Sequence, residues 1–538
     1  MHFISWWLGS AEDDSDHDRS SSSIASESDC RSNTDIDAFE NQPTVKDFQA
    51  LRDRCLAEGT LFEDPEFPAN NFSIYHSNPP KKGEREFEWK RPGEIVPSPK
   101  FVTEGFSRFD VRQGIIGNCW FISSCSALTS HQELFERVVL LDNGQFEADH
   151  YAGLFHFRFW QYGQWVEVIV DDRLPVDKNN QLLFISSSEK DEFWGALLEK
   201  AYAKLHGSYE ALDSGTGREG MVDLTGGITE FYRLKGNEPD DLFERLESNL
   251  ARRSLITAGI NGNERERVQS VNLVPQHEYS VTKVTRLDAT LHMLDFGAGN
   301  AVDVRLICVR NPWGRGEWSG AWGDHSLEWI MVRDEKMEEL NIVKEDGEFW
   351  MNFEDFVHHF DDVSVCYQCP GDMGKELKAR YPWEMVTEMG EWRRSATAGG
   401  SDENSFWSNP QYVLKLAHHE GHEDDPRISV TIGLMQKHHR AKGTSFLSLR
   451  LLVFPIPDHV LTGNRSLPKS FFDNVMPVET EANFETTREV VGRYKLPPGR
   501  YVVVPHTWKP QQEAEFMLRI FAEGSVTKLY YCAGDVIG

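Results

Sequence analysis

The sequence has no excess of basic residues, no dense cysteine pattern and no long apolar run. Its 538 residues include 86 acidic and 56 basic side chains, for a net charge of -30. A nucleic-acid binder needs a basic footprint, so we expect no nucleic-acid partner. The eight cysteines are scattered along the chain. This spacing argues against a disulfide framework and favours a reducing compartment.

The apolar segment at residues 3–8 is too short to cross a bilayer and has no basic residues before it, so it supports neither an anchor nor a signal peptide. We therefore expect a cytoplasmic protein. Residues 12–41 are rich in Ser and Asp and poor in apolar groups, which is typical of a disordered tail. The remaining length suggests several domains.

What the sequence does contain is a cysteine in a Gly-punctuated turn, Cys119, followed by the apolar residues 120–128. A cysteine at a helix N-terminus feels the positive end of the helix dipole, which favours the thiolate. Gln113, six residues upstream, can supply a hydrogen-bond donor to an oxyanion. Taken alone, a cysteine in an apolar helix is more often a buried structural residue.

Two later segments change that interpretation. His277 heads an alternating, strand-like run, and Asn311 ends a second apolar strand at residues 306–310. Cys, His and Asn in this order form the papain-type arrangement, in which His activates the thiol and Asn orients the imidazole. The pattern predicts Cys119 as nucleophile, His277 as general base and then acid, and Asn311 as its orienter.

With these segments in place, the chain resembles the calpain family of calcium-dependent cysteine proteases. The similarity runs from about residue 62 to about residue 523 and is densest at residues 113–121, 192–204, 310–322 and 346–351. Asn118 stands where the family commonly has an aspartate. The resemblance implies an α+β fold with a two-lobed papain-like protease core followed by an antiparallel, C2-like β-sandwich.

The expected domains are a disordered tail and linker at 1–61, the Cys-bearing lobe at 62–217, the lobe with His277 and Asn311 at 218–371, the sandwich at 372–523 and a C-terminal tail at 524–538. Residue patterns agree with this division. Alternation predicts a strand at 165–172, apolar periodicity predicts a helix at 193–205, and short strands are predicted at 430–435, 446–454, 501–505 and 515–521.

The resemblance also implies two Ca²⁺ sites, built from hard oxygen ligands. Matching residues for the first site are Asp110 and Glu192 with the carbonyls of Thr103 and Gly105. For the second they are Glu317, Asp324 and Asp346 with the carbonyls of Lys344 and Glu348. On spacing alone, each acid is more often a solvated surface charge.

Three further residues match the family's substrate cleft: Gly215, Gln276 and Trp313. Gln276 stands where conventional relatives have a glycine. The resemblance gives Trp313 the role of a wedge that keeps the resting cleft open. It also implies a link between the two calcium sites, from Arg108 to Glu348.

These features predict a calcium-dependent endopeptidase that makes limited cuts in protein substrates. An alternative is a non-catalytic relative that binds calcium or phospholipid through its sandwich, and a transglutaminase fits less well because it usually orients its His with Asp. The sequence holds no EF-hand loop of the Asp-x-Asp-x-Asp-Gly type. We therefore expect no small-subunit pairing, and calcium activation that survives deletion of the residues beyond about 370.

Two weaker clusters remain. Cys366 and Cys369 form a lone Cys-x-x-Cys, for which two ordinary thiols are favoured over zinc. His418, His419 and His422 share an acidic loop, which we interpret as solvated, although this loop could contribute to a calcium or phospholipid response.

Overall fold

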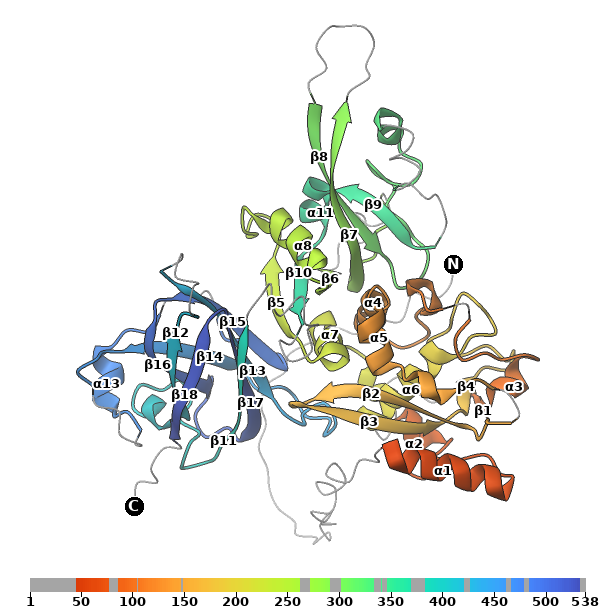
Figure 1. Cartoon of the computed structure of the whole chain (residues 1–538), viewed down its shortest axis with the longest axis horizontal. Coiled ribbons are helices and arrows are strands. Elements are labelled where there is room, and N and C mark those ends of the chain that lie inside the picture. The colour runs from red at the N-terminus through yellow and green to blue at the C-terminus, as the bar shows by residue number, and fades with distance from the viewer. Residues whose placement is uncertain are drawn as a thin grey trace, which may run out of the picture. The chain divides into compact units, whose positions relative to one another are not determined.

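The structure, a computed structural model, describes residues 45–76, 86–103, 105–146, 149–261, 271–290, 301–332, 340, 346–368, 383–419, 426–460, 466–478 and 483–532. All of them belong to the unit Pro43–Gly538. Helices and antiparallel sheets occur together in this unit (Figure 1), and the predicted α+β fold class is confirmed. No helix among the described residues is long and apolar enough to cross a membrane.

The first lobe is built around α4 (Cys119–Leu128), in which every residue after Cys119 is buried. The helix predicted over residues 193–205 is α6, and the strand predicted over residues 165–172 is β3. The larger elements of this lobe are α5 (Gln132–Val138), α6 (Trp194–His206), α7 (Gly217–Thr225), β2 (Leu154–Gln161) and β3 (Gln164–Asp171). The short ones are α2 (Asn71–Ile74), α3 (Pro92–Ile95), β1 (Glu88–Lys90) and β4 (Leu174–Val176).

The second lobe is a six-stranded antiparallel sheet in the order β5-β10-β6-β7-β8-β9. Ile256 and its alternate neighbours face the helices α8 (Leu242–Ala251) and α11 (Phe353–His359), whereas Leu255 faces the first lobe. Successive residues of a strand point to opposite faces, so one sheet serves both cores. The strands are β5 (Ile228–Arg233), β6 (Leu255–Ile260), β7 (His277–Thr290), β8 (Ala301–Arg310), β9 (Glu348–Asn352) and β10 (Asp362–Tyr367).

The third part is a β-sandwich of two four-stranded antiparallel sheets, ordered β11-β17-β13-β15 and β14-β16-β12-β18. Their inward-facing apolar residues form one core, and the four predicted strands overlap β13, β14, β16 and β17. The elements are β11 (Glu384–Trp392), β12 (Gln411–Ala417), β13 (Ile428–Gln436), β14 (Leu449–Ile456), α13 (Lys469–Asn474), β15 (Glu489–Leu496), β16 (Gly499–Thr507), β17 (Ala514–Ala522) and β18 (Ser525–Cys532).

The predictions for the two ends of the chain were partly wrong. Within the expected tail at 1–61, residues 45–58 form helix α1 (Val45–Glu58), because Phe48 and Cys55 lie on one helix face and are buried against the first lobe. Within the expected tail at 524–538, β18 pairs with β12 and completes a sheet of the sandwich. Residues 1–44, which carry the rest of the predicted tail, lie outside the described part of the chain.

Candidate active site

Three elements bring the predicted catalytic side chains together. Cys119 is the first residue of α4, His277 is the first residue of β7, and Asn311 directly follows β8. Strands β7 and β8 pair antiparallel, with Ser280 opposite Arg310. This pairing brings residues far apart in sequence into contact, and His277 Nε2 lies 2.9 Å from Asn311 Oδ1.

The orientation of the Asn311 amide is fixed by its other hydrogen bonds. Oδ1 also accepts the backbone N–H of Trp313 at 3.0 Å, and Nδ2 donates to the Gly316 carbonyl at 3.2 Å. Because Oδ1 accepts, Nε2 of His277 must carry the ring proton. The Nδ1 lone pair of His277 is then left to take a proton from a thiol.

The Cys119 thiol lies beside the start of β7. The backbone of Glu278, the residue after His277, favours the thiolate and so partly opposes the rise that burial causes in the pKa of Cys119. The Ser123 hydroxyl, one turn along α4, donates to the Glu278 carbonyl at 2.8 Å. This bond and the contact between the Ser126 and Ser280 hydroxyls at 3.2 Å hold the nucleophile-bearing helix against the strand that carries the base.

Burial controls the charge of both groups. It raises the pKa of the Cys119 thiol to about 11. It lowers the pKa of the His277 imidazole to about 4, against the opposing effect of the Asn311 hydrogen bond. The predicted helix-dipole effect on the thiol is therefore outweighed by desolvation. At neutral pH both groups are uncharged in this arrangement, so the thiol must lose its proton to His277 during attack.

Gln113 and Trp313 connect the two lobes next to the triad. The Trp313 indole N–H donates to Gln113 Oε1 at 2.9 Å, and its ring centroid lies 4.8 Å from that of His277. Gln113 Nε2 donates to the Ile116 carbonyl at 2.8 Å, which leaves a second amide hydrogen for an oxyanion. Trp313 thus joins the two lobes in this structure. The wedge role that the resemblance implies concerns a state in which the lobes are apart, and it stays a prediction.

The other two predicted cleft residues are Gly215, which lies against Trp120, and Gln276. At Gly215 a Cβ would overlap the ring of Trp120, the residue after Cys119, so only glycine fits there. Gln276 precedes His277, is exposed, and has a φ of +54°. L-residues rarely adopt this left-handed conformation, whereas glycine adopts it readily.

The first predicted calcium site has paired carboxylates in a buried setting. Burial raises the pKa of Glu192 to about 7, and the nearby charge of Asp110 adds to this rise. The buried hydroxyl of Thr103 has no hydrogen-bond partner among the described residues, and its backbone N–H donates to Glu192 at 2.8 Å. Two neighbouring carboxylates beside hydroxyl and carbonyl oxygens are a set that suits Ca²⁺.

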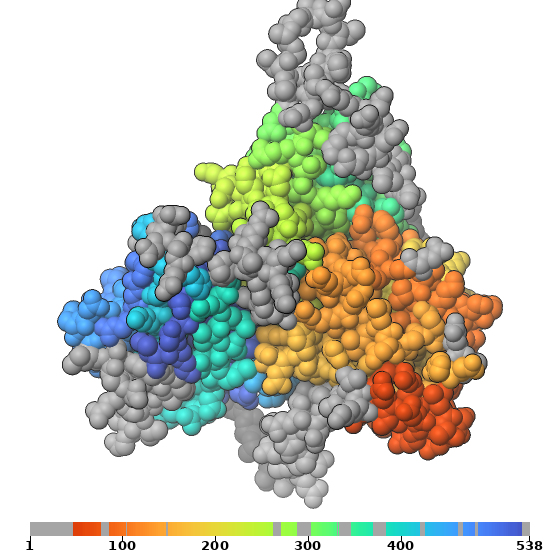
Figure 2. Space-filling view, viewed as in Figure 1, coloured from red at the N-terminus to blue at the C-terminus, as the bar shows by residue number. Residues whose placement is uncertain are grey.

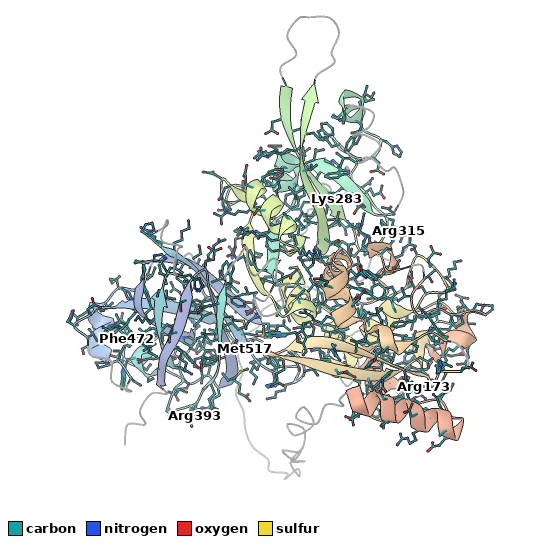
Figure 3. The ribbon with its side chains drawn as sticks, viewed as in Figure 1. Arg173, Lys283, Arg315, Arg393, Phe472 and Met517 are labelled. Carbon is teal, nitrogen blue, oxygen red and sulfur yellow. The ribbon has the colours of Figure 1, made fainter. Side chains whose placement is uncertain are left out.

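At the second predicted calcium site, one of the expected ligand residues lies outside the described part of the chain. Burial raises the pKa of Glu317, and the charges of Asp324 and Asp346 raise it further. Asp324 and Asp346 line a cavity of about 90 Å³ that Lys283, labelled in Figure 3, also lines. Lys344 lies outside the described residues. Within the described ranges, no three His, Cys, Asp or Glu residues are arranged to surround a metal ion, so both ligand sets stay predictions.

The contact predicted between Arg108 and Glu348 is present, whereas the calcium sites that it would link stay predictions. Arg108 Nη2 lies 2.6 Å from Glu348 Oε2, and the second carboxylate oxygen of Glu348 accepts the Thr282 hydroxyl at 2.8 Å. Arg108 belongs to the first lobe and Glu348 to the second. This ion pair therefore joins the lobes beside both candidate sites.

Sequence reasoning missed two acids near the nucleophile. Glu199 accepts the Asn118 side-chain amide at 2.5 Å, and burial raises the pKa of Glu199 to about 8. Burial also raises the pKa of Glu278 to about 7. The signal for Glu199 was an acid within the apolar pattern of α6, and for Glu278 it was an acid next to the predicted base.

The structure adds no support for metal binding at the Cys-x-x-Cys pair or at the histidine-rich loop. Cys366 is buried beside the Thr225 hydroxyl, and Cys369 lies outside the described residues. His418 and His419 are described and partly buried, whereas His422 and the acids after it are not described. A metal role for either cluster therefore stays without support.

Comparison with known proteins shows two family matches. Residues 62–367 match the model described as calpain family cysteine protease, and residues 388–521 match that of calpain large subunit, domain III. Calpain-B of Drosophila melanogaster is 42% identical over 90% of this chain, and Calpain-A of the same fly is 42% identical over 89%. The human calpain-2 catalytic subunit is 41% identical over 89% of the chain. The chain spans 52% of Calpain-B, 58% of Calpain-A and 68% of human calpain-2.

Proposed function

Because the chain belongs to the calpain family of cysteine proteases, we propose that it is a calcium-dependent endopeptidase that makes limited cuts in cytoplasmic proteins. The observation that carries the proposal is the hydrogen bond between His277 and Asn311 beside a cysteine at a helix N-terminus. These are the parts that nucleophilic acyl transfer requires.

The chemistry follows from the positions of these groups. His277 Nδ1 takes the thiol proton as Cys119 Sγ attacks the peptide carbonyl carbon, and Asn311 holds the imidazole in place. The oxyanion that forms lies near the Cys119 backbone N–H and the Gln113 amide. When the C–N bond breaks, His277 gives its proton to the leaving amine.

The remaining thioester is then hydrolysed. His277 takes a proton from water, whose oxygen attacks the thioester carbonyl, and the C–S bond breaks. His277 returns its proton to the departing Cys119 sulfur, which restores the thiol, and the acid product leaves. The uncharged resting state of Cys119 and His277 fits this use of the imidazole as a base.

Calcium dependence is proposed from the donor chemistry of the two carboxylate groups. Asp110 and Glu192, with the Thr103 and Gly105 carbonyls, would hold one Ca²⁺. Bound Ca²⁺ would supply positive charge that offsets carboxylate repulsion. Glu317, Asp324 and Asp346, with the Lys344 and Glu348 carbonyls, would hold a second. The Arg108–Glu348 ion pair then holds the lobes in register beside both sites.

The alternative is a non-catalytic scaffold that binds calcium or phospholipid through the sandwich. The hydrogen bond between His277 and Asn311 and the match to the calpain cysteine protease family support the protease. The expectation of no small-subunit pairing stays a prediction. Cleavage itself is the property that separates the two functions.

The deciding experiment is a casein cleavage assay with and without Ca²⁺. We expect cleavage only with Ca²⁺, none in Cys119→Ser, and normal cleavage in the matched control Cys125→Ser, whose thiol is buried in the same helix. Asp110→Asn should raise the Ca²⁺ concentration needed, whereas Asp177→Asn, at an exposed turn, should not. Cleavage by folded Cys119→Ser would overturn the mechanism, and no cleavage by wild type would favour the scaffold.

A further inference from the structure

One side chain of the sandwich reaches into the protease core next to the nucleophile. Arg440 follows β13, and its side chain is 12% exposed. Its Nη1 donates to the carbonyls of Ala211 at 2.8 Å and Ser214 at 3.0 Å. Its Nη2 and Nε donate to Glu219 Oε2 at 2.9 Å and 3.2 Å. The guanidinium carbon also lies 4.9 Å from the ring centroid of Trp120.

The partners of Arg440 belong to the loop at residues 211–216, which carries Gly215, and to the helix after it. The same loop is also bound to the nucleophile segment. Trp120 Nε1 donates to the Leu212 carbonyl at 3.1 Å, and the Ser214 backbone N–H donates to the Gly117 carbonyl at 3.0 Å. The loop is therefore held between the Cys119 segment and Arg440.

The loop needs such support because its backbone is strained. Ser214 has a φ of +73°, a left-handed conformation that costs an L-residue about 1–2 kcal/mol. A strained residue persists only where its surroundings over-determine it. Here the Ser214 N–H is fixed by Gly117 and its carbonyl by Arg440, so removal of either bond frees the loop to relax.

The ion pairs around Arg440 also explain why an arginine, and not a lysine, is needed at this position. Arg488 Nη1 lies 2.8 Å from Asp223 Oδ2 on α7, and Arg440 pairs with Glu219 one turn earlier. A buried cation, Arg488, and a partly buried one, Arg440, therefore meet two buried acids. A lysine at position 440 would keep the ion pair, but one ammonium cannot reproduce the planar fork that reaches two carbonyls and a carboxylate.

We propose that Arg440 is a positioning residue for substrate binding, which holds loop 211–216 so that Gly215 faces the substrate main chain beside Cys119. This inference rests on the proposed protease function. It makes the sandwich a part of the substrate cleft, acting through one guanidinium. Arg440 takes no part in proton transfer.

The test compares substrate binding with the intrinsic reactivity of the thiol. In Arg440→Ala, with saturating Ca²⁺, we expect KM for a peptide substrate to rise about tenfold, since charged hydrogen bonds to the loop are lost. The rate at which iodoacetamide alkylates Cys119, mapped by mass spectrometry, should stay within about twofold because this reagent does not need the loop. Arg440→Lys should fold normally and still show most of the rise in KM.

The matched control is Arg493→Ala, which removes another ion pair between sandwich and core, Arg493 to Glu230 at 3.2 Å, away from the loop. We expect its KM to be unchanged. The proposal is overturned if folded Arg440→Ala has a normal KM, if KM and alkylation change by the same factor, or if Arg493→Ala behaves identically. If wild type cleaves no peptide, the protease proposal fails, and calorimetric binding of a tripeptide aldehyde to wild type and Arg440→Ala still decides the role of Arg440.

Discussion

At the scale of single residues, Gln276 combines strain with a position in the cleft. Its φ of +54° suits glycine. Gln276 directly precedes the base His277 in the chain, and its side chain is exposed. We predict that Gln276→Gly raises kcat/KM for bulky peptide substrates. Relief of about 1–2 kcal/mol of strain is largely offset by the greater freedom of glycine in the unfolded chain, so stability should change by less than about 1 kcal/mol.

Steady-state kinetics on small and bulky peptides would check this prediction. Gln511 also has a left-handed backbone, with φ of +62°, but lies in the sandwich. Gln511→Gly is therefore the control and should leave kinetics unchanged. Equal or lower activity of folded Gln276→Gly on bulky peptides would show that the glutamine is neutral or useful to the enzyme.

Asp223 links residue chemistry to acid stability. Burial alone would raise the pKa of Asp223, but the Arg488 guanidinium and His206 outweigh it and hold the pKa at about 2. Because the folded pKa is below the ordinary value of 3.8, the stabilisation is present above about pH 4 and is lost as the pH falls toward 2. Its size is of order 2 kcal/mol.

Acid unfolding of wild type and Asp223→Asn would measure this effect. The variant should be less stable at pH 7, and the difference should shrink between about pH 4 and pH 2. Asp241→Asn, at the exposed ion pair between the residue before α8 and Arg245, should show a much smaller difference, because solvent screens this pair. A constant gap between wild type and Asp223→Asn over this range would contradict the pKa argument.

At the scale of elements, local signals located the catalytic parts well. The predicted positions of Cys119 at a helix start, His277 at a strand start and Asn311 at a strand end are confirmed by α4, β7 and β8. What the sequence could not supply was packing between distant segments. The pKa values of Cys119 and His277 depend on burial in the assembled lobes, and the contacts of Arg440 depend on how the sandwich docks.

Helix α1 is a second case in which the sequence did not reveal packing between distant segments. Its neighbours at 12–41 are polar, but Phe48 is fully buried and its ring lies 3.6 Å from that of His156, parallel to within 1°. We predict that Phe48→Ala lowers the free energy of unfolding by about 3–5 kcal/mol, because it leaves a cavity under the helix.

Urea unfolding would check this prediction, with Phe72→Ala as the matched control. Phe72 is 82% exposed, so its truncation should change stability by less than about 0.5 kcal/mol. If Phe48→Ala were as stable as Phe72→Ala, α1 would not be an integral part of the lobe, and the expectation of a linker at residues 45–58 would be restored.

At the scale of the whole described unit, the sandwich is bound to the core by more than Arg440. Figure 2 shows the teal surface of the sandwich meeting the gold surface of the β2–β3 hairpin. Met517, labelled in Figure 3, and Met435 pack with Trp160 and Val222 of the core. Arg519, which is fully buried, donates to the Gly226 carbonyl at the end of α7 at 2.8 Å.

This interface opposes the expectation that calcium activation survives deletion of the residues beyond about 370. Deletion would expose Trp160 and Val222. It would also remove the Arg440 and Arg488 partners of Glu219 and Asp223 and the Arg519 hydrogen bond to the Gly226 carbonyl. Each of these contacts supports α7 and the loop before it, whereas the second-lobe sheet has its own core under α8 and α11. The loss should therefore be local to α7 and loop 211–216.

We predict that the isolated lobes, residues 43–370, exchange amide hydrogens faster in α7 and in residues 211–216 than the full chain does, with little change in β6, β7 and β8. Peptide binding should weaken at least as much as in Arg440→Ala, while Ca²⁺ still binds. Hydrogen exchange followed by mass spectrometry, with Ca²⁺ present, would resolve these segments. Unchanged exchange in α7 together with full peptide affinity would show that the protease core holds its own cleft and that the sandwich is dispensable for catalysis.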